Sequence, residues 1–393
     1  MEWKLVDPLL DEGKMPNLAR IIDQGVRADL RSLEPREKSP TIWTTIATGK
    51  GPLKHGIADF LEGTDNEPLY NSLGWLARPV WEILGDSGRS VGVVAWLMSW
   101  PALPVNGYNV TDRIVYSPED GYDPIPNATY PAELADELAP FVVSMASTPD
   151  DSIAGFLNGD LWSGSDEANF AWGGVQSVKD IFVTDRTVLR VSKHLLDTRE
   201  QPDFTALYFI GLDRCCHRFW GPMQPWTVDI ITPDDFNETF KDVIPRYYER
   251  VDRIIGQVLD SIDDDTTVIV CSDHGFRGPK KTKEGLQLGI EMHSLVGVFA
   301  AMGPGIRKGA KPADASVFDI TPTILALFGE PIGRDMDGFV IEQAIDEGYL
   351  ERHPVGYIDT YETGEVRQQP GEPVESPVDD QIKEELRSLG YID

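Results

Sequence analysis

The 393-residue sequence predicts a doubly wound α/β fold, in which a mostly parallel β-sheet carries helices on both faces. Short apolar runs rich in Val, Ile and Phe recur along the chain, namely SVGVVAW, FTALYFIG, TTVIVC and VGVFAAMG. Segments with helical spacing separate them, including VTDRTVLRVSKHLL and IPRYYERVDRIIGQVLDSI. Buried strands that alternate with helices are typical of a parallel sheet covered on both sides.

The first elements are predicted to be a helix and a strand. MPNLARIIDQGV has apolar residues at helical spacing, with Pro16 near its start and Gly25 at its end, and VRADLRSL alternates like a strand. We expect residues 1–104 and 177–350 to form one core. Residues 105–176 are rich in Pro, Gly, Asp and Ser and predict a cap or insertion, with one helix over YPAELADELAPFVV. Residues 351–393 predict a polar linker and a C-terminal docking helix, in which Ser376 is the N-cap and Asp379 its N3 partner.

The charge balance restricts the partners of the chain. It has 35 basic and 65 acidic residues, a net charge of −30. Such a surface repels nucleic-acid polymers and anionic membranes. We interpret it as adaptation to a high-salt cytoplasm, as in a halophilic archaeon, with an ordinary solvated acidic surface as the alternative. The sequence has no long apolar run, no signal-peptide pattern at its start and three Cys, so we expect a soluble cytoplasmic protein.

Acidic and histidine side chains stand where apolar strands begin or end. ALYFIGLDRCCHRFWGP contains Asp213 and His217, TTVIVCSDHG contains Asp273 and His274, and EMHSLVGVFAAMGPG contains His293. Ligands of open α/β sheets bind beyond the carboxyl ends of the strands. Imidazole and carboxylate groups suit zinc and similar divalent ions. A single His is often structural, but three of the six His in this arrangement predict a metal site.

The segment EKSPTIWTTIATGKGPLKHGI supplies a candidate nucleophile. Ser39 and Pro40 predict the N-cap and first residue of a helix, and Gly49 predicts its end. A hydroxyl at a helix N-terminus lies at a natural phosphate site, and a nearby divalent ion could lower its pKa. A plain helix cap is the alternative interpretation.

Taken in order, these motifs resemble the alkaline phosphatase superfamily, in particular the archaeal and bacterial form of its type I phosphodiesterase/nucleotide pyrophosphatase branch. The resemblance runs through MPNLARIIDQGV, SPTIWTTIATGKGPLKHGI, GLDRCCHRFW, SDHG, MHSLVGVFAAMGPGI, DITPTILALFG and LRSLGYI. It implies an alkaline phosphatase-like core and two divalent metal ions, zinc first, with manganese or magnesium as alternatives. One ion would be held by Asp213, His217 and His293, and the second by Asp273 and His274.

The resemblance also implies the nucleophile. In several branches it lies ten residues before the Gly of a Thr-Gly pair, which is Ser39 here, and Thr41 is the weaker alternative. Sulfatases have a modified Cys there and an Arg four residues later, whereas this chain has Ser39 and Trp43, which argues against sulfatase chemistry. The implied reaction is two-ion phosphoryl transfer through a phosphoseryl intermediate, with backbone N–H groups near Pro40 and Thr41 supporting the phosphoryl oxygens. His55, which recurs in the family, is expected to be structural.

We therefore expect a metal-dependent phosphodiesterase or nucleotide pyrophosphatase that acts on a small phosphorylated substrate selected by the cap. A phosphomonoesterase or phosphotransferase on the same scaffold is one alternative. A catalytically impaired binding protein is another, because the first strand of the family ends in an Asp that binds the second ion. MEWKLVDPLL resembles the segment after that strand and offers only Glu2.

Overall fold

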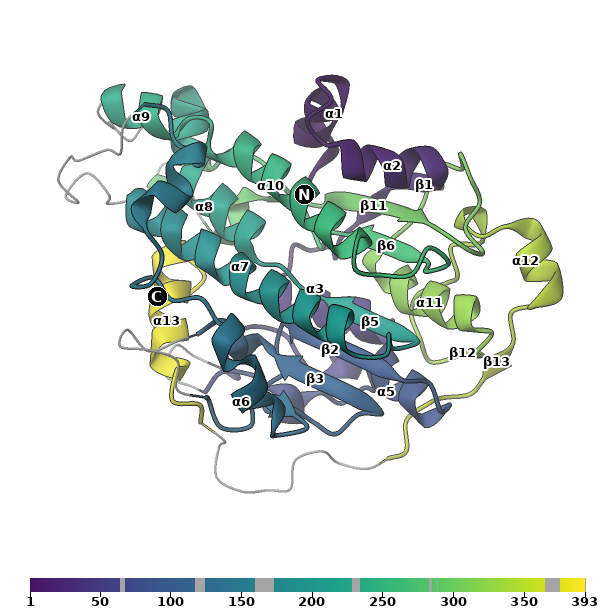
Figure 1. The fold of residues 1–393 in the computed structure, drawn as a ribbon. Helices are drawn as coiled ribbons and strands as arrows, with labels where there is room; N and C mark the ends of the chain where they lie inside the picture. Colours follow the sequence, from purple (N-terminus) through teal and green to yellow (C-terminus); the bar gives the residue numbers. More distant parts are fainter. Residues whose placement is uncertain are drawn as a thin grey trace.

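The computed structural model describes residues 1–63, 68–116, 124–159, 173–227, 234–282, 285–287, 289–364 and 375–392. Two larger sheets have the strand orders β4-β3-β2-β5 and β1-β11-β6 (Figure 1). Their strands are β1 Val26–Arg31, β2 Val91–Trp96, β3 Gly107–Thr111, β4 Thr129–Tyr130, β5 Phe204–Leu207, β6 Val268–Cys271 and β11 Val296–Met302. Short two-stranded sheets are formed by β7 Gly275–Phe276 with β10 His293–Ser294, β8 Lys280–Thr282 with β9 Gly285–Gln287, and β12 Ile332–Gly333 with β13 Tyr357–Ile358.

Most strands of the two larger sheets run parallel to one another within their own sheet. Strand β2 pairs in parallel with both β3 and β5. Strand β11 pairs antiparallel with both β1 and β6, so β1 and β6 point the same way and β11 is the reversed strand between them. The predicted mixed α/β class with a mostly parallel sheet is confirmed.

Helices cover both faces of the β1-β11-β6 sheet. Along β11, Val298, Ala300 and Met302 pack into one hydrophobic core, and Phe299 and Ala301 pack into another. Because neighbouring strand residues point to opposite faces, both faces of β11 are buried. The helices of the first core are α1 Trp3–Asp11, α2 Pro16–Gln24, α7 Val175–Thr198, α8 Gly211–Met223, α9 Asp234–Phe240 and α10 Val243–Leu259. Those of the second are α3 Ser39–Thr48, α5 Val80–Asp86, α11 Ile320–Phe328 and α13 Asp379–Leu389.

The helix predicted over MPNLARIIDQGV and the strand predicted over VRADLRSL are present as α2 and β1. Pro16 opens α2, and the side chains of β1 alternate between the core and the surface. Gly25 joins the two elements because the chain passes very close to β11 there. A Cβ atom on Gly25 would lie 1.8 Å from the carbonyl oxygen of Ala301, so only glycine fits.

The segment predicted to form a cap contributes to the sheet. Residues 107–111 form β3, which pairs with β2 in the sheet, so the sheet continues past residue 105. The helix predicted over YPAELADELAPFVV is shorter, since α6 covers Leu134–Leu138 and Pro140 follows closely. The remainder of this segment includes residues 117–123 and 160–172, which lie outside the described residues.

The C-terminal docking helix is present as α13, which lies beside α8 in Figure 1. It begins at Asp379 and not directly after Ser376, although the backbone N–H of Ser376 does donate to the Asp379 carboxylate at 2.9 Å. The described residues also include the short α-helices α4 Pro52–His55 and α12 Glu347–Arg352. None of the helices in the described ranges is long and apolar enough to cross a membrane.

Candidate active site

The ends of several strands bring the candidate residues to one edge of the fold. Because β6 and β11 run in opposite directions, the end of β6 lies beside the start of β11, and the Ser272 N–H donates to the Val298 carbonyl at 3.0 Å. Asp273 and His274 follow β6, and His293 in β10 precedes β11. Helix α8, which carries the remaining pair of predicted ligands, starts soon after β5, and α3 follows β1.

The predicted ligands of the first ion form a cluster. Asp213 and His217 share a face of α8, with 3.7 Å between Asp213 Oδ1 and His217 Nε2. His217 Nε2 is 3.0 Å from His293 Nε2, and Asp213 Oδ1 is 3.9 Å from the same atom of His293. His274 adjoins the cluster, with Nε2 3.5 Å from Asp213 Oδ1. The ligand atoms of Asp213, His274 and His293 all lie within 4.8 Å of one another.

The carboxylates of the cluster fit a bound cation. Asp273 Oδ2 lies 3.5 Å from His274 Nε2. Among the described residues, neither Asp213 Oδ1 nor Asp273 Oδ2 has a hydrogen-bond partner, although both atoms are buried. A buried carboxylate oxygen left without a partner is costly, and a divalent cation coordinated by carboxylates and imidazoles removes that cost. The residues present therefore suit the metal site that the sequence predicts.

Burial sets the protonation of the imidazoles. Desolvation, assisted by the charge of His274, lowers the pKa of His217 to about 3. Desolvation also lowers the pKa of His293 well below its ordinary value. Both rings are therefore neutral at pH 7, the form in which imidazole binds metals. Burial raises the pKa of Asp213 to about 6, against the opposing effect of His274.

Ser39 lies beside this cluster at the start of α3. Its Oγ atom is 3.3 Å from His274 Nε2. The prediction that Ser39 is the N-cap is wrong by one residue, because Lys38 has the extended N-cap backbone and Ser39 is the first helical residue. The Lys38 carbonyl accepts the first helical hydrogen bonds, from the N–H groups of Thr41 and Ile42 at 3.1 and 3.3 Å. The backbone support expected near residues 40 and 41 is corrected accordingly: Pro40 has no N–H, and the N–H of Thr41 is already bonded.

Thr41, the alternative nucleophile, has a different environment. Its side chain is fully buried, and its hydroxyl has no hydrogen-bond partner within the described parts of the chain. Ser39 lines a cavity together with Asp213 and Tyr391, and Thr41 is not among the described residues that line it. Geometry thus favours Ser39 over Thr41 as the group that meets a substrate.

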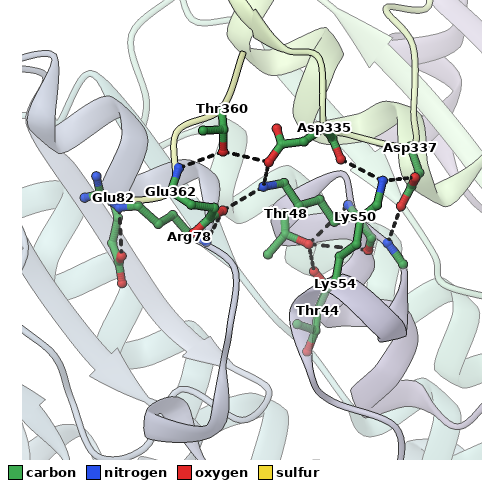
Figure 2. Close-up of polar contacts among 11 residues, drawn as sticks. Thr44, Thr48, Lys50, Lys54, Arg78, Glu82, Asp335, Asp337, Thr360 and Glu362 are labelled. Atoms are coloured by element: carbon green, nitrogen blue, oxygen red, sulfur yellow. Dashed lines mark hydrogen bonds and ion pairs between the residues drawn. The ribbon is translucent and has the colours of Figure 1, made fainter. Parts of the chain in front are cut away.

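Contacts in and just after its C-terminal half fix the position of helix α3, which carries Ser39. His55 Nε2 lies 3.0 Å from Thr45 Oγ1, and His55 Nδ1 accepts from the Ile57 N–H at 3.1 Å, which agrees with a structural role for this histidine. The helix ends at Gly49, whose φ of 68° is left-handed. Directly after it, the buried Lys50 ammonium bonds Asp335 at 2.6 Å and Glu362 at 2.7 Å (Figure 2).

Comparison with known proteins identifies the family. The family model described as type I phosphodiesterase/nucleotide pyrophosphatase matches residues 1–289. The chain belongs to this family. It is also similar to GPI ethanolamine phosphate transferase 3 of Schizosaccharomyces pombe, with 25% identity over 147 residues that make up 36% of this chain and 14% of the relative. The catalytic subunit of the same transferase from Mus musculus is 22% identical over 201 residues, which make up 50% of this chain and 16% of that protein.

A solved sulfatase structure shares the fold. The 2-O GAG sulfatase BT1596 superposes with a TM-score of 0.50 at 12% identity, covering 83% of this chain and 67% of that one. Human ectonucleotide pyrophosphatase/phosphodiesterase 5 covers 80% of this chain and 90% of its own, with a TM-score of 0.44 and 13% identity. Family membership indicates an enzyme that acts on phosphate esters.

In this member of the type I phosphodiesterase family, three site neighbours have roles that the sequence did not indicate. Glu2, the suggested substitute ligand, accepts from the Phe276 N–H at 3.0 Å and the Ser294 hydroxyl at 3.2 Å. Tyr391 places its hydroxyl 2.8 Å from His217 Nε2. Lys38 donates to the Tyr391 carbonyl at 2.9 Å. The motif LRSLGYI contains Tyr391, but nothing in the motif indicates that the tyrosine side chain contacts α8.

Proposed function

We propose that the protein is a metal-dependent phosphodiesterase or nucleotide pyrophosphatase with Ser39 as its nucleophile. The observation that carries this proposal is the position of Ser39, whose Oγ lies 3.3 Å from His274 Nε2 within the Asp and His cluster. A candidate nucleophile and a candidate metal site therefore adjoin the same cavity, as phosphoryl transfer requires.

Asp213, His217 and His293 would hold one divalent ion, and Asp273 and His274 would contribute to a second, with zinc the first choice. Bound cations at these positions would supply charge that lowers the pKa of the Ser39 hydroxyl and neutralises the phosphoryl oxygens. The neutral imidazoles and the unpartnered oxygens of Asp213 and Asp273 support this assignment.

The chain's own contribution is to orient the nucleophile. In the proposed reaction, Ser39 Oγ forms a bond to phosphorus while the bond from phosphorus to the alcohol oxygen breaks. The Ser39 proton ends on the departing alcohol, directly or through water. A water molecule then attacks the phosphoserine, which restores the hydroxyl and releases a phosphate monoester.

The test compares two variants on a diester, bis(p-nitrophenyl) phosphate, with p-nitrophenyl phosphate as the monoester reference. Ser39→Ala should lower the diester rate by at least about a thousandfold, because the nucleophile is lost. Thr41→Val, which removes only the buried neighbouring hydroxyl, should retain activity. The opposite pattern would reassign the nucleophile to Thr41, and equal rates for wild type and both variants would favour a binding protein without this chemistry.

Transfer of the phosphoryl group to an alcohol is the second candidate reaction. It is supported by the similarity to two GPI ethanolamine phosphate transferases, of which the matched segment covers 14% and 16%. The same phosphoseryl intermediate would then be attacked by an alcohol in place of water. Adding glycerol or ethanolamine to the diester assay tests this: a transferase yields a new phosphodiester, whereas a hydrolase yields the monoester alone.

A small phosphorylated molecule is the proposed substrate. The net charge of −30 opposes binding of a nucleic-acid polymer or an anionic membrane. Cys215, Cys216 and Cys271 are all free, which suits the cytoplasm that we propose as the location.

A further inference from the structure

The end of the chain reaches into the candidate active site. Tyr391 follows α13 and is buried. Its hydroxyl lies 2.8 Å from His217 Nε2 and 3.0 Å from His293 Nε2, which are themselves 3.0 Å apart. Three polar atoms from α8, β10 and the C-terminal segment therefore form a nearly equilateral triangle.

This placement is built into the fold by several contacts. Arg214, buried on α8, pairs with Glu385 of α13 at 2.5 Å. Arg218, one helical turn further along α8, donates to the Ser388 carbonyl at 3.1 Å. The Lys38 ammonium donates to the Tyr391 carbonyl at 2.9 Å, so the residue before Ser39 also holds this segment. A buried arginine that loses its paired carboxylate costs several kcal/mol, roughly 3–5, of folding free energy. The Arg214–Glu385 pair therefore holds α13 at one defined position against α8.

Tyr391 is among the residues that line the cavity beside the candidate nucleophile. Tyr391, Ser39 and Asp213 line the same cavity. The two nitrogens that contact the hydroxyl are those that would bind the proposed ion. Once an ion engages both nitrogens, the hydroxyl needs another hydrogen-bond partner.

We infer that Tyr391 is a substrate-contacting residue, whose hydroxyl donates a hydrogen bond to a non-bridging oxygen of the phosphoryl group attacked by Ser39. The inference rests on the proposed function. A donor placed where negative charge develops stabilises the transition state more than the ground state. The substrate would therefore be contacted from two distant parts of the chain, the start of α3 and the C-terminal segment.

The experiment compares Tyr391→Phe with Tyr361→Phe in the zinc-loaded full chain. Tyr361 is a suitable control because its hydroxyl donates to the Pro331 carbonyl at 2.5 Å and not to any site residue. For Tyr391→Phe, kcat on the diester should fall by about a hundredfold to a thousandfold, with a smaller change in KM. Orthovanadate, which adopts the geometry of the transition state, should bind at least about tenfold more weakly. Tyr361→Phe should behave like the wild type.

Zinc content, measured by mass spectrometry, separates this role from others. Retained zinc with weakened vanadate binding supports the inference. Loss of zinc in Tyr391→Phe would overturn it, because the hydroxyl would then belong to the metal site. Unchanged kcat and vanadate affinity would also overturn it and leave Tyr391 as packing. If the wild type cleaves no ester, the proposed function fails, and vanadate binding alone decides whether the hydroxyl contacts a phosphoryl-like oxyanion.

Discussion

Burial determines the protonation of the individual histidines in and near the site. His217 and His293 are buried beside Asp213, and His55 is buried behind α3. In each case the pKa is lowered first by desolvation. Neutral rings are required for metal binding at the first two positions and for the Thr45 and Ile57 contacts at the third. The same physical effect therefore serves chemistry at one place and packing at another.

His55 should make the stability of the protein depend on pH. Its pKa falls from 6.5 in the unfolded chain to about 4 in the folded protein. A depressed pKa contributes stability that is present above 6.5 and is lost as the pH falls towards 4. Through His55, the free energy of unfolding should decrease by about 2 kcal/mol between about pH 7 and about pH 5. Urea unfolding at both pH values measures this. In His55→Gln the free energy of unfolding should change less between the two pH values than in the wild type, and an equal change would contradict the assigned pKa.

Asp213 should control the metal content. Its Oδ1 atom lies 3.5 to 3.9 Å from the Nε2 atoms of three histidines. The substitution Asp213→Asn would remove the charge of the side chain while keeping its shape. We expect zinc affinity to fall by at least about tenfold. Competition with a chelator measures the affinity, and Asp29→Asn on the exposed side of β1 is the matched control. Equal zinc affinity in Asp213→Asn and the control would remove Asp213 from the ligand set.

At the scale of elements, α3 is the part whose placement matters most, because its first turn carries Ser39 and Lys50 follows directly after its end. The Lys50 side chain is 3% exposed, and its ammonium lies between Asp335 and Glu362, which connects the end of α3 to the segments on either side of β13 (Figure 2). Thr360 adds a hydrogen bond to Asp335 at 2.7 Å. The network thus fixes the far end of the helix on which the nucleophile stands.

Lys50→Met should therefore destabilise the protein, because two partly buried carboxylates would lose their common cation. We expect the free energy of unfolding to fall by about 2 kcal/mol. Lys54→Met is the control, since the Lys54 side chain is 45% exposed where it pairs with Asp337, and its loss should cost less than about 1 kcal/mol. Chemical unfolding of both variants provides the comparison. A larger loss for Lys54→Met would contradict this account of the network.

The sequence predicts those elements that local pattern determines. Strand β1 could be predicted because its side chains alternate, and the cluster of Asp213, His274 and His293 could be predicted because strand ends meet at one edge. The reversed direction of β11 could not, since an apolar run looks the same in either direction. Nor could Tyr391, whose contact with His217 spans 174 residues and depends on how α13 packs against α8.

At the scale of the whole molecule, electrostatic repulsion is the dominant unusual feature. A chain with 65 acidic and 35 basic residues repels itself when folded, and salt screens this repulsion. We expect the Tm to rise steadily between about 0.1 M and about 2 M KCl, as the Debye length shortens from ~10 Å to below ~3 Å. Calorimetry in KCl and NaCl of equal ionic strength measures this, and a flat Tm in both salts would argue against adaptation to high salt.

The interleaved spacing on α8 has a mechanical consequence. Asp213 and His217 point to the site, while Arg214 and Arg218, each one residue later, hold α13. Each residue advances a helix by about 100° around its axis. Inserting one alanine between Asp213 and Arg214 would therefore turn Asp213 by about 100° relative to His217 and to both arginines. Because one helix carries both the candidate metal ligands and the arginines that bind α13, a movement of α8 would displace the ligands and the C-terminal segment together.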